Sequence, residues 1–281
     1  MIRSRTLYSG QLVSLLRLDH PSDRIHRDPA EEVATTHSVS FVEQGGYTLH
    51  QGKRRWRMDS TRLFVTRPGL PYRCSHPDQS PGDVCFSVHL SPGLIDDVSS
   101  TLGRGWSLRT PTASLTNRLA YLRWRLVEIV ADGESEISCP ALAGELLAAL
   151  GPEGYDGHDG PDAGRLFRAG QLAWYARRVD AARARLTEGY AQPQSLEMIA
   201  RDAGMSPFHF SRVFRELCGV PPYRYLLQVR LARAAERLAG GAGVTDTCHA
   251  TGFSNLGHFI RSFRRRYGSP PSRYRPSSAR R

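Results

Sequence analysis

The pattern of apolar and polar residues divides the chain into a first half with strand periodicity and a second half with helical periodicity. Between Ser38 and Leu90, short runs of alternating apolar and polar residues are separated by Gly, Pro and Asp clusters, which is typical of antiparallel strands. In the last run one face carries Val84, Phe86, Val88 and Leu90, and the other carries Cys85, Ser87 and His89. We therefore predict an α+β chain that begins with a small antiparallel barrel or sandwich.

Two helical patterns follow these strands, over Leu115–Val130 and Pro140–Leu150. In the first pattern the apolar side chains recur every three or four residues and form one stripe. We expect the two helices to cover the sheet or to form a dimer contact.

Residues 151–165 are rich in Gly, Pro and acidic residues and have almost no large apolar side chains. Such a segment cannot bury enough apolar surface to offset the entropy of ordering it. We therefore predict an interdomain linker at 151–165, between a first domain at 1–150 and a helical domain at 166–281.

The helical domain contains two short helices joined by a turn. Leu196, Ile199, Ala200 and Ala203 form one apolar stripe behind the N-cap residue Ser195. Gly204 ends this helix, and Ser206 with Pro207 begins the next one. The second helix buries Phe210, Val213, Phe214 and Leu217, and turns outward Phe208, Ser211, Arg212 and Arg215. Two helices, a Gly-marked turn and an exposed basic face predict a helix-turn-helix.

The same unit recurs further along the chain. Phe259, Arg261, Phe263 and Gly268 follow Phe210, Arg212, Phe214 and Gly219 by 49 positions, whereas Gly252 follows Gly204 by 48. The second copy should therefore have one extra residue in its turn. Between the copies, residues 222–238 predict a single helix about 25 Å long, which would act as a stiff spacer. Two units held in this way could enter successive major grooves, which lie about 34 Å apart on one face of B-DNA.

The distribution of charge along the chain supports this prediction. The chain has 281 residues and a net charge of +11, and residues 166–281 contain 20 Arg against 7 acidic residues. The preceding residues contain 18 Lys and Arg against 20 acidic residues, so the positive field belongs to the helical half. A field of this kind attracts polyanions, although a basic face that only aids solubility is an alternative.

Five scattered Cys residues without a C-x-x-C pair indicate reduced thiols and a cytoplasmic location. The apolar run LVSLLRL is too short and too charged for a signal sequence or a membrane span. We expect no cofactor and no membrane partner.

RLARAAERL followed by GFSNLGHFIRSFRRRYGSPPSRYR resembles the double helix-turn-helix domain of AraC-type transcriptional regulators, and the resemblance covers residues 180–275. The upstream stretches HSVSFVEQGGYTLH and RPGLPYRCSH are similar to the cupin-type sensor domain of that family. The resemblance implies a bacterial regulator, usually an activator, that binds double-stranded DNA and has RNA polymerase as a partner. Its N-terminal barrel would bind a small effector or form a homodimer.

The family pattern also assigns roles to the outward residues. The expected base readers are Phe208, Ser211, Arg212, Gly257, Ile260 and Arg261, and the expected phosphate contacts are Arg215, Arg264, Arg265 and Arg266. Arg212 and Arg261 are the strongest candidates because an Arg fork can donate two hydrogen bonds to guanine. In the alternative, either Arg lies along its own helix or binds phosphate.

Some residues depart from the family pattern. Thr247, Cys248, His249 and Thr251 stand where the first helix of the second copy is usually more aliphatic, so we expect looser packing there. Cys248 should be a small core residue rather than a redox sensor.

In the first half, His37, His50, His76 and His89 lack the spacing of a metal site. Trp56, Tyr72 and Phe86 could line an effector pocket or could simply be core. Two further functions stay open: a cupin enzyme with a DNA-binding appendage, for which no catalytic residue is visible, and a non-specific architectural binder of nucleic acid.

Overall fold

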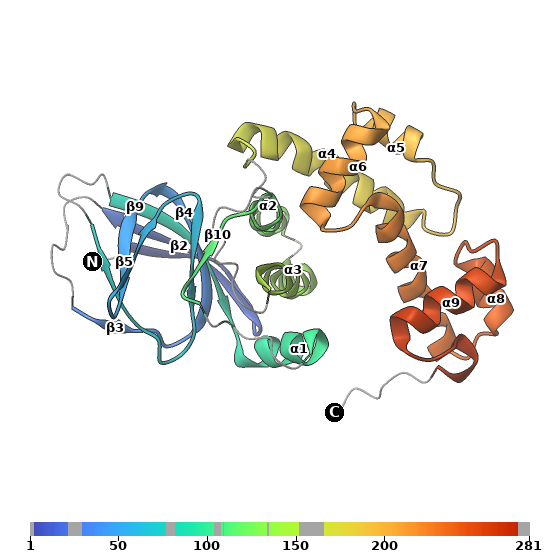
Figure 1. The fold of residues 1–281 in the computed structure, drawn as a ribbon, viewed down its shortest axis with the longest axis horizontal. Coiled ribbons are helices and arrows are strands. Elements are labelled where there is room, and N and C mark those ends of the chain that lie inside the picture. The colour runs from blue at the N-terminus through green and yellow to red at the C-terminus, as the bar shows by residue number, and fades with distance from the viewer. Residues whose placement is uncertain are drawn as a thin grey trace. The chain divides into compact units, whose positions relative to one another are not determined.

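The computed structural model describes residues 3–21, 30–76, 82–103, 108, 110–133, 135–151 and 166–274. The chain forms two compact units, Met1–Leu172 and Ala173–Arg281, and Figure 1 labels many of their elements. The predicted linker falls almost entirely outside the described residues, so its extent stays a prediction.

The first unit contains two antiparallel sheets. The larger sheet has the order β1 (Arg3–Ser9), β2 (Val13–Pro21), β9 (Gly82–Leu90), β4 (His37–Gly45), β7 (Arg62–Thr66), β10 (Thr112–Ser114). The smaller sheet has the order β3 (Glu32–Val33), β8 (Pro71–Ser75), β5 (Tyr47–Gln51), β6 (Arg54–Met58). All strands from β4 to β9 were predicted from the alternation, whereas β1, β2, β3 and β10 lie outside the predicted range. The predicted barrel is not closed, because within the described residues no ladder joins the two sheets.

Helices α1 (Pro92–Leu102), α2 (Asn117–Asp132) and α3 (Ser135–Leu150) lie against one face of the larger sheet (Figure 1). The core beneath them joins strand residues such as Phe41, Phe86 and Val88 to Leu122 and Leu146 of the helices. The prediction that the two helical patterns cover the sheet is confirmed. The helix α1, which begins after the N-cap residue Ser91, was not predicted.

The other face of the larger sheet carries several hydroxyl groups that are nevertheless buried. Ser87 is 1% exposed, and the hydroxyl pairs Ser38–Thr66 and Ser40–Ser87 each lie 2.8 Å apart. These residues line a cavity in the first unit. Three aromatic residues were candidates for such a lining. Tyr72 does line the cavity, Phe86 packs on the opposite face under the helices, and Trp56 packs beside the smaller core without lining the cavity.

The second unit is helical. It contains most of α4 (Ala169–Glu188), then α5 (Leu196–Asp202), α6 (Pro207–Cys218), α7 (Pro222–Ala239), α8 (Val244–Ala250), α9 (Leu256–Tyr267) and a 3-10 turn at Pro271–Arg273. The predicted spacer helix is confirmed as α7. Over the part of the chain that the structure describes, no helix has the length and apolar character needed to cross a bilayer. In the same residues no group of three or more His, Cys, Asp or Glu side chains could hold a metal ion.

Candidate nucleic-acid interface

The first helix-turn-helix module consists of α5, a turn and α6. Gly204 occupies the left-handed region at φ +66°, and the next N–H, that of Met205, donates to the carbonyl oxygen of Ala200 at 2.9 Å. Ser206 then caps α6, because its Oγ accepts from the N–H of His209 at 3.3 Å. The turn is therefore closed by a glycine at its start and a hydroxyl cap at its end.

The second module repeats this construction in α8, a turn and α9. Gly252 has φ +80°, the N–H of Phe253 donates to Cys248 at 3.1 Å, and Asn255 caps α9 by accepting from His258 at 2.8 Å. The helices α8 and α5 begin 48 residues apart, whereas α9 and α6 begin 49 apart. The extra turn residue predicted from the sequence is confirmed.

The second helix of each module, α6 in the first and α9 in the second, is its recognition helix and buries one aromatic stripe. Phe210, Phe214, Phe259 and Phe263 are all fully buried. Cys248 is also fully buried in the core of the second module, as predicted for a small core residue. The threonines that flank it are inward as well, and Thr251 donates from its Oγ1 to the carbonyl oxygen of Thr247 at 2.7 Å. The Thr247 hydroxyl itself is buried with no hydrogen-bond partner among the described residues.

The expected base readers of the first module lie at the outer face of α6. Phe208 is 82% exposed, which is unusual for a large aromatic side chain and leaves its ring available to a partner. Arg212 is exposed, and its Nη2 lies 3.4 Å from Nδ1 of His209. The Nε2 of His209 is in turn 3.1 Å from the hydroxyl of Tyr175 on α4. Ser211 is half-buried and lines a small cavity beside Tyr223.

The expected base readers of the second module are placed differently. Arg261 is exposed, and its Nη1 is 3.3 Å from where a Cβ on Gly257 would lie, so the guanidinium group lies over the glycine. Ile260 is half-buried and packs partly against the module core. The second recognition helix therefore presents less side-chain surface than the first.

The expected phosphate contacts are exposed arginines near the ends of the recognition helices: Arg215, Arg264, Arg265 and Arg266. Among the described residues none of them forms an ion pair, whereas Arg185 is paired with Asp202 and Arg233 with Glu236. Arginines without an acidic partner remain available to phosphate oxygens.

A contact between the two modules accompanies the spacer helix. Arg230 on α7 donates from Nε to the carbonyl oxygen of Tyr190 at 2.8 Å and from Nη2 to that of Gln192 at 3.1 Å. Gly252, in the turn of the second module, lies against the same loop and against Arg230. A Cβ there would lie 2.8 Å from the carbonyl oxygen of Ala191 and 3.0 Å from the Arg230 guanidinium carbon. The turn of the second module therefore packs on the loop that precedes the first, which the sequence did not predict.

Two capped helix-turn-helix modules, each with exposed arginines on its second helix, place the second unit in the class of double helix-turn-helix domains. Residues 199–277 match the family described as a helix-turn-helix domain. The virulence regulon transcriptional activator VirF of Yersinia enterocolitica is 32% identical over 91 residues, which are 32% of this chain and 34% of VirF. The transcriptional activator RhaS of Escherichia coli is 32% identical over 97 residues, 34% of this chain and 35% of RhaS.

Among solved structures, a probable AraC family transcriptional regulator from Rhodopseudomonas palustris is 30% identical, with a TM-score of 0.33, and the match covers 36% of this chain and 99% of that one. Over residues 199–277 the chain is therefore similar to the helix-turn-helix domains of these regulators. It spans about a third of the length of the curated relatives named above.

Proposed function

We propose that this protein is a sequence-specific DNA-binding transcription regulator whose two modules read successive major grooves from one side of the duplex. The observation that carries the proposal is the repeated module, in which equivalent exposed arginines, Arg212 and Arg261, stand at the same helical position. The module contact at Arg230 and Gly252 supports it, because a fixed spacing between two readers favours one spacing between two half-sites.

Roles within the interface follow from side-chain chemistry. Arg212 and Arg261 would each donate to a guanine edge, and Phe208 would contact a thymine methyl group. Ser211, Gly257 and Ile260 would adjoin the bases with less reach, because the first and third are half-buried and Gly257 has no side chain. Arg215, Arg264, Arg265 and Arg266 would bind phosphates and supply affinity that does not depend on sequence.

The remaining parts of the proposal concern the whole protein. VirF and RhaS are named as transcriptional activators, which supports activation and RNA polymerase as a partner for this chain. We place the protein in the cytoplasm and infer that it acts without enzymatic chemistry. Its first unit would sense a small effector, form a homodimer, or do both, and the helices α1–α3 offer a surface for the dimer contact.

The test is selection of bound fragments from sheared genomic DNA by the purified full chain, followed by affinity measurements at fixed salt. We expect the selected duplex to bind at least about 1,000-fold more tightly than a random duplex of equal length. Equal affinity for both duplexes would contradict the proposal and favour a non-specific architectural binder.

A further inference from the structure

A cavity of about 340 Å³ lies in the first unit, between strands of both sheets. Its polar wall is one face of β9, formed by Asp83, Cys85, Ser87 and His89. The alternation along this strand places Phe86, Val88 and Leu90 under the helices and these four in the cavity. Ser87 and Cys85 already have partners within the unit, because Ser87 lies 2.8 Å from the Ser40 hydroxyl and the Cys85 thiol lies 3.3 Å from Asp83. A group that a bound polar molecule could satisfy must therefore lie elsewhere in the lining.

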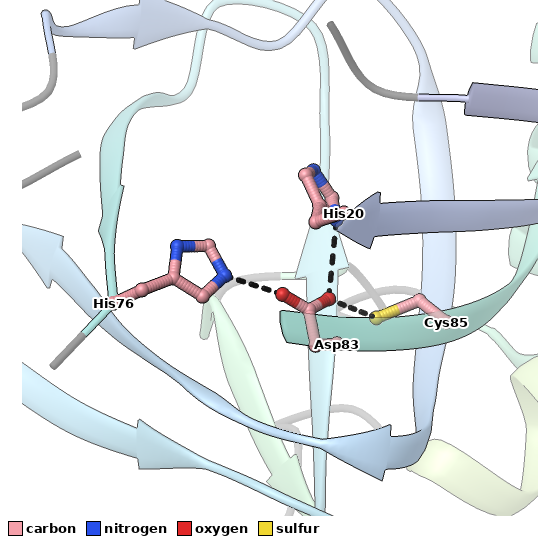
Figure 2. Close-up of polar contacts among 4 residues, drawn as sticks. All are labelled: His20, His76, Asp83 and Cys85. Carbon is pink, nitrogen blue, oxygen red and sulfur yellow. Dashed lines mark hydrogen bonds and ion pairs between the residues drawn. The ribbon is translucent and has the colours of Figure 1, made fainter. Parts of the chain in front are cut away.

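At one end of the cavity Asp83 is the centre of a hydrogen-bonded cluster (Figure 2). Its side chain has no exposed surface. One carboxylate oxygen accepts from Nε2 of His76, and the other lies 3.2 Å from Nδ1 of His20 and 3.3 Å from the thiol of Cys85. Burial by itself raises the pKa of Asp83, but the hydrogen bonds from the two histidines outweigh burial and hold the pKa well below its usual range. The cavity therefore contains a buried carboxylate that stays charged.

One ring nitrogen of His76 is buried in this cluster without a hydrogen-bond partner in the described part of the chain. Its side chain is 9% exposed, and Nε2 faces Asp83. Nδ1, on the other side of the ring, is buried and has no hydrogen-bond partner among the described residues. When Nε2 donates to a carboxylate, Nδ1 of the neutral ring is an acceptor. A molecule with an N–H or O–H donor would satisfy it.

The charged and aromatic side chains that line the cavity indicate which kind of molecule it would bind. Glu32 also lines the cavity, and the described residues of the lining include no Lys or Arg. Against these residues an anion would face two carboxylates without a permanent cation to offset its desolvation. Three aromatic rings also line the cavity, those of Tyr47, Phe64 and Tyr72, and the last two meet edge to face with ring centroids 5.0 Å apart. Carboxylates beside aromatic rings are the surroundings that an organic cation prefers.

We propose that this cavity binds a compact organic amine in its protonated form, with the ammonium group donating at the Asp83–His76 end and the carbon skeleton against Phe64 and Tyr72. This site goes beyond DNA binding and supplies the effector class for the proposed sensor. Its test is carried out without DNA, so its failure would leave the DNA-binding proposal untouched.

The experiment compares three probes that share one ring: benzylamine, benzyl alcohol and benzoate. Thermal unfolding and saturation-transfer NMR of the full chain would be recorded with each probe, at concentrations up to the order of tens of millimolar, because small probes bind weakly. We expect benzylamine to raise Tm, benzyl alcohol to raise it less, and benzoate to leave it unchanged. A benzoate shift as large as that of benzylamine, or no benzylamine shift, would overturn the proposal.

Three variants test whether benzylamine binds in this cavity. Asp83→Asn keeps the shape of the side chain and removes its charge, and we expect benzylamine to bind about tenfold more weakly to it. Glu32→Gln is the second variant, used to keep the test decisive if Asp83→Asn does not fold, and it should also weaken the amine. His50→Gln is the control, because His50 bonds Ser75 and does not line the cavity. Unchanged benzylamine binding in every folded carboxylate variant would refute the assignment.

Discussion

The hydroxyl of Tyr175 on α4 lies 3.1 Å from Nε2 of His209, whose Nδ1 lies 3.4 Å from the guanidinium group of Arg212. An exposed arginine side chain has many rotamers, and ordering it on binding costs free energy. The Tyr175–His209 pair limits that cost for Arg212. In the second module Arg261 lies over Gly257 instead.

This relationship predicts that Tyr175 and His209 act as positioning residues for Arg212. Tyr175→Phe removes the hydroxyl and keeps the ring, so we expect lower discrimination between the selected duplex and a duplex changed at one base pair. Non-specific affinity and its salt dependence should stay the same, because no phosphate contact is touched. Fluorescence anisotropy over a salt series measures both. Unchanged discrimination would show that the Tyr175 hydroxyl serves only the packing of α4.

Arg212→Ala should cost about 1–3 kcal/mol of discrimination at one base pair of the first half-site. Competition binding against all single-base variants of the site checks this. Arg212→Lys is the matched control: it keeps the charge but loses the fork, so overall affinity should be largely retained while discrimination falls. An equal loss on every sequence would instead assign Arg212 to the phosphate contacts.

Arg265 is expected to behave in the opposite way. Arg265→Ala should weaken selected and random duplexes alike, and should reduce the slope of log affinity against log salt by about one unit. Arg265→Lys should restore most of the affinity because a point charge suffices for phosphate. A variant that lost affinity for the selected duplex alone would contradict this role.

The module contact predicts a difference between two glycines that occupy equivalent turns. Gly204→Ala must adopt a positive φ in open space, at a cost of about 1–2 kcal/mol. Gly252→Ala has the same φ cost and also places its Cβ 2.8 Å from the carbonyl oxygen of Ala191. We expect Gly252→Ala to lower the stability of the second unit more, and to reduce affinity for the two-groove site more than for a single half-site. Urea unfolding and anisotropy measure the two effects, and equal values for both variants would argue against a rigid contact.

The lowered pKa of Asp83 predicts the sign of a pH effect on the first unit. A carboxyl whose pKa is lower in the folded state stabilises the fold above its unfolded pKa, about 4, and this contribution is lost as the pH falls. Stability should therefore decline below pH of about 4, and less steeply in Asp83→Asn. Asp97→Asn, at an exposed position, is the control and should follow the unaltered protein. Thermal unfolding across this pH range checks the expectation; identical slopes for Asp83→Asn and the unaltered protein would contradict it.

Several features followed from short-range pattern. The strands β4–β9 were predictable because alternation has a period of two, and α6 and α9 because Phe210 and Phe214, like Phe259 and Phe263, are four residues apart. The extra turn residue was visible as the change from an offset of 48 to one of 49. Strand β2 was missed because its apolar run LVSLLRL was interpreted only as a possible signal or membrane segment, and β1 precedes every run that was predicted as a strand. His20 lies at the end of β2 and was missed with that strand. Asp83 was predictable, because the alternation along β9 places it on the same face as Cys85 and Ser87.

What the sequence by itself determined is the set of elements and which face of each is apolar, because these depend on residues only a few positions apart. What only the tertiary structure decided is which distant residues meet: His20 and His76 on Asp83, Tyr175 beside His209, and Gly252 against the loop at Ala191. Such contacts depend on how sheets and helices pack, and a polar face reads the same in sequence whether it meets water or lines a cavity.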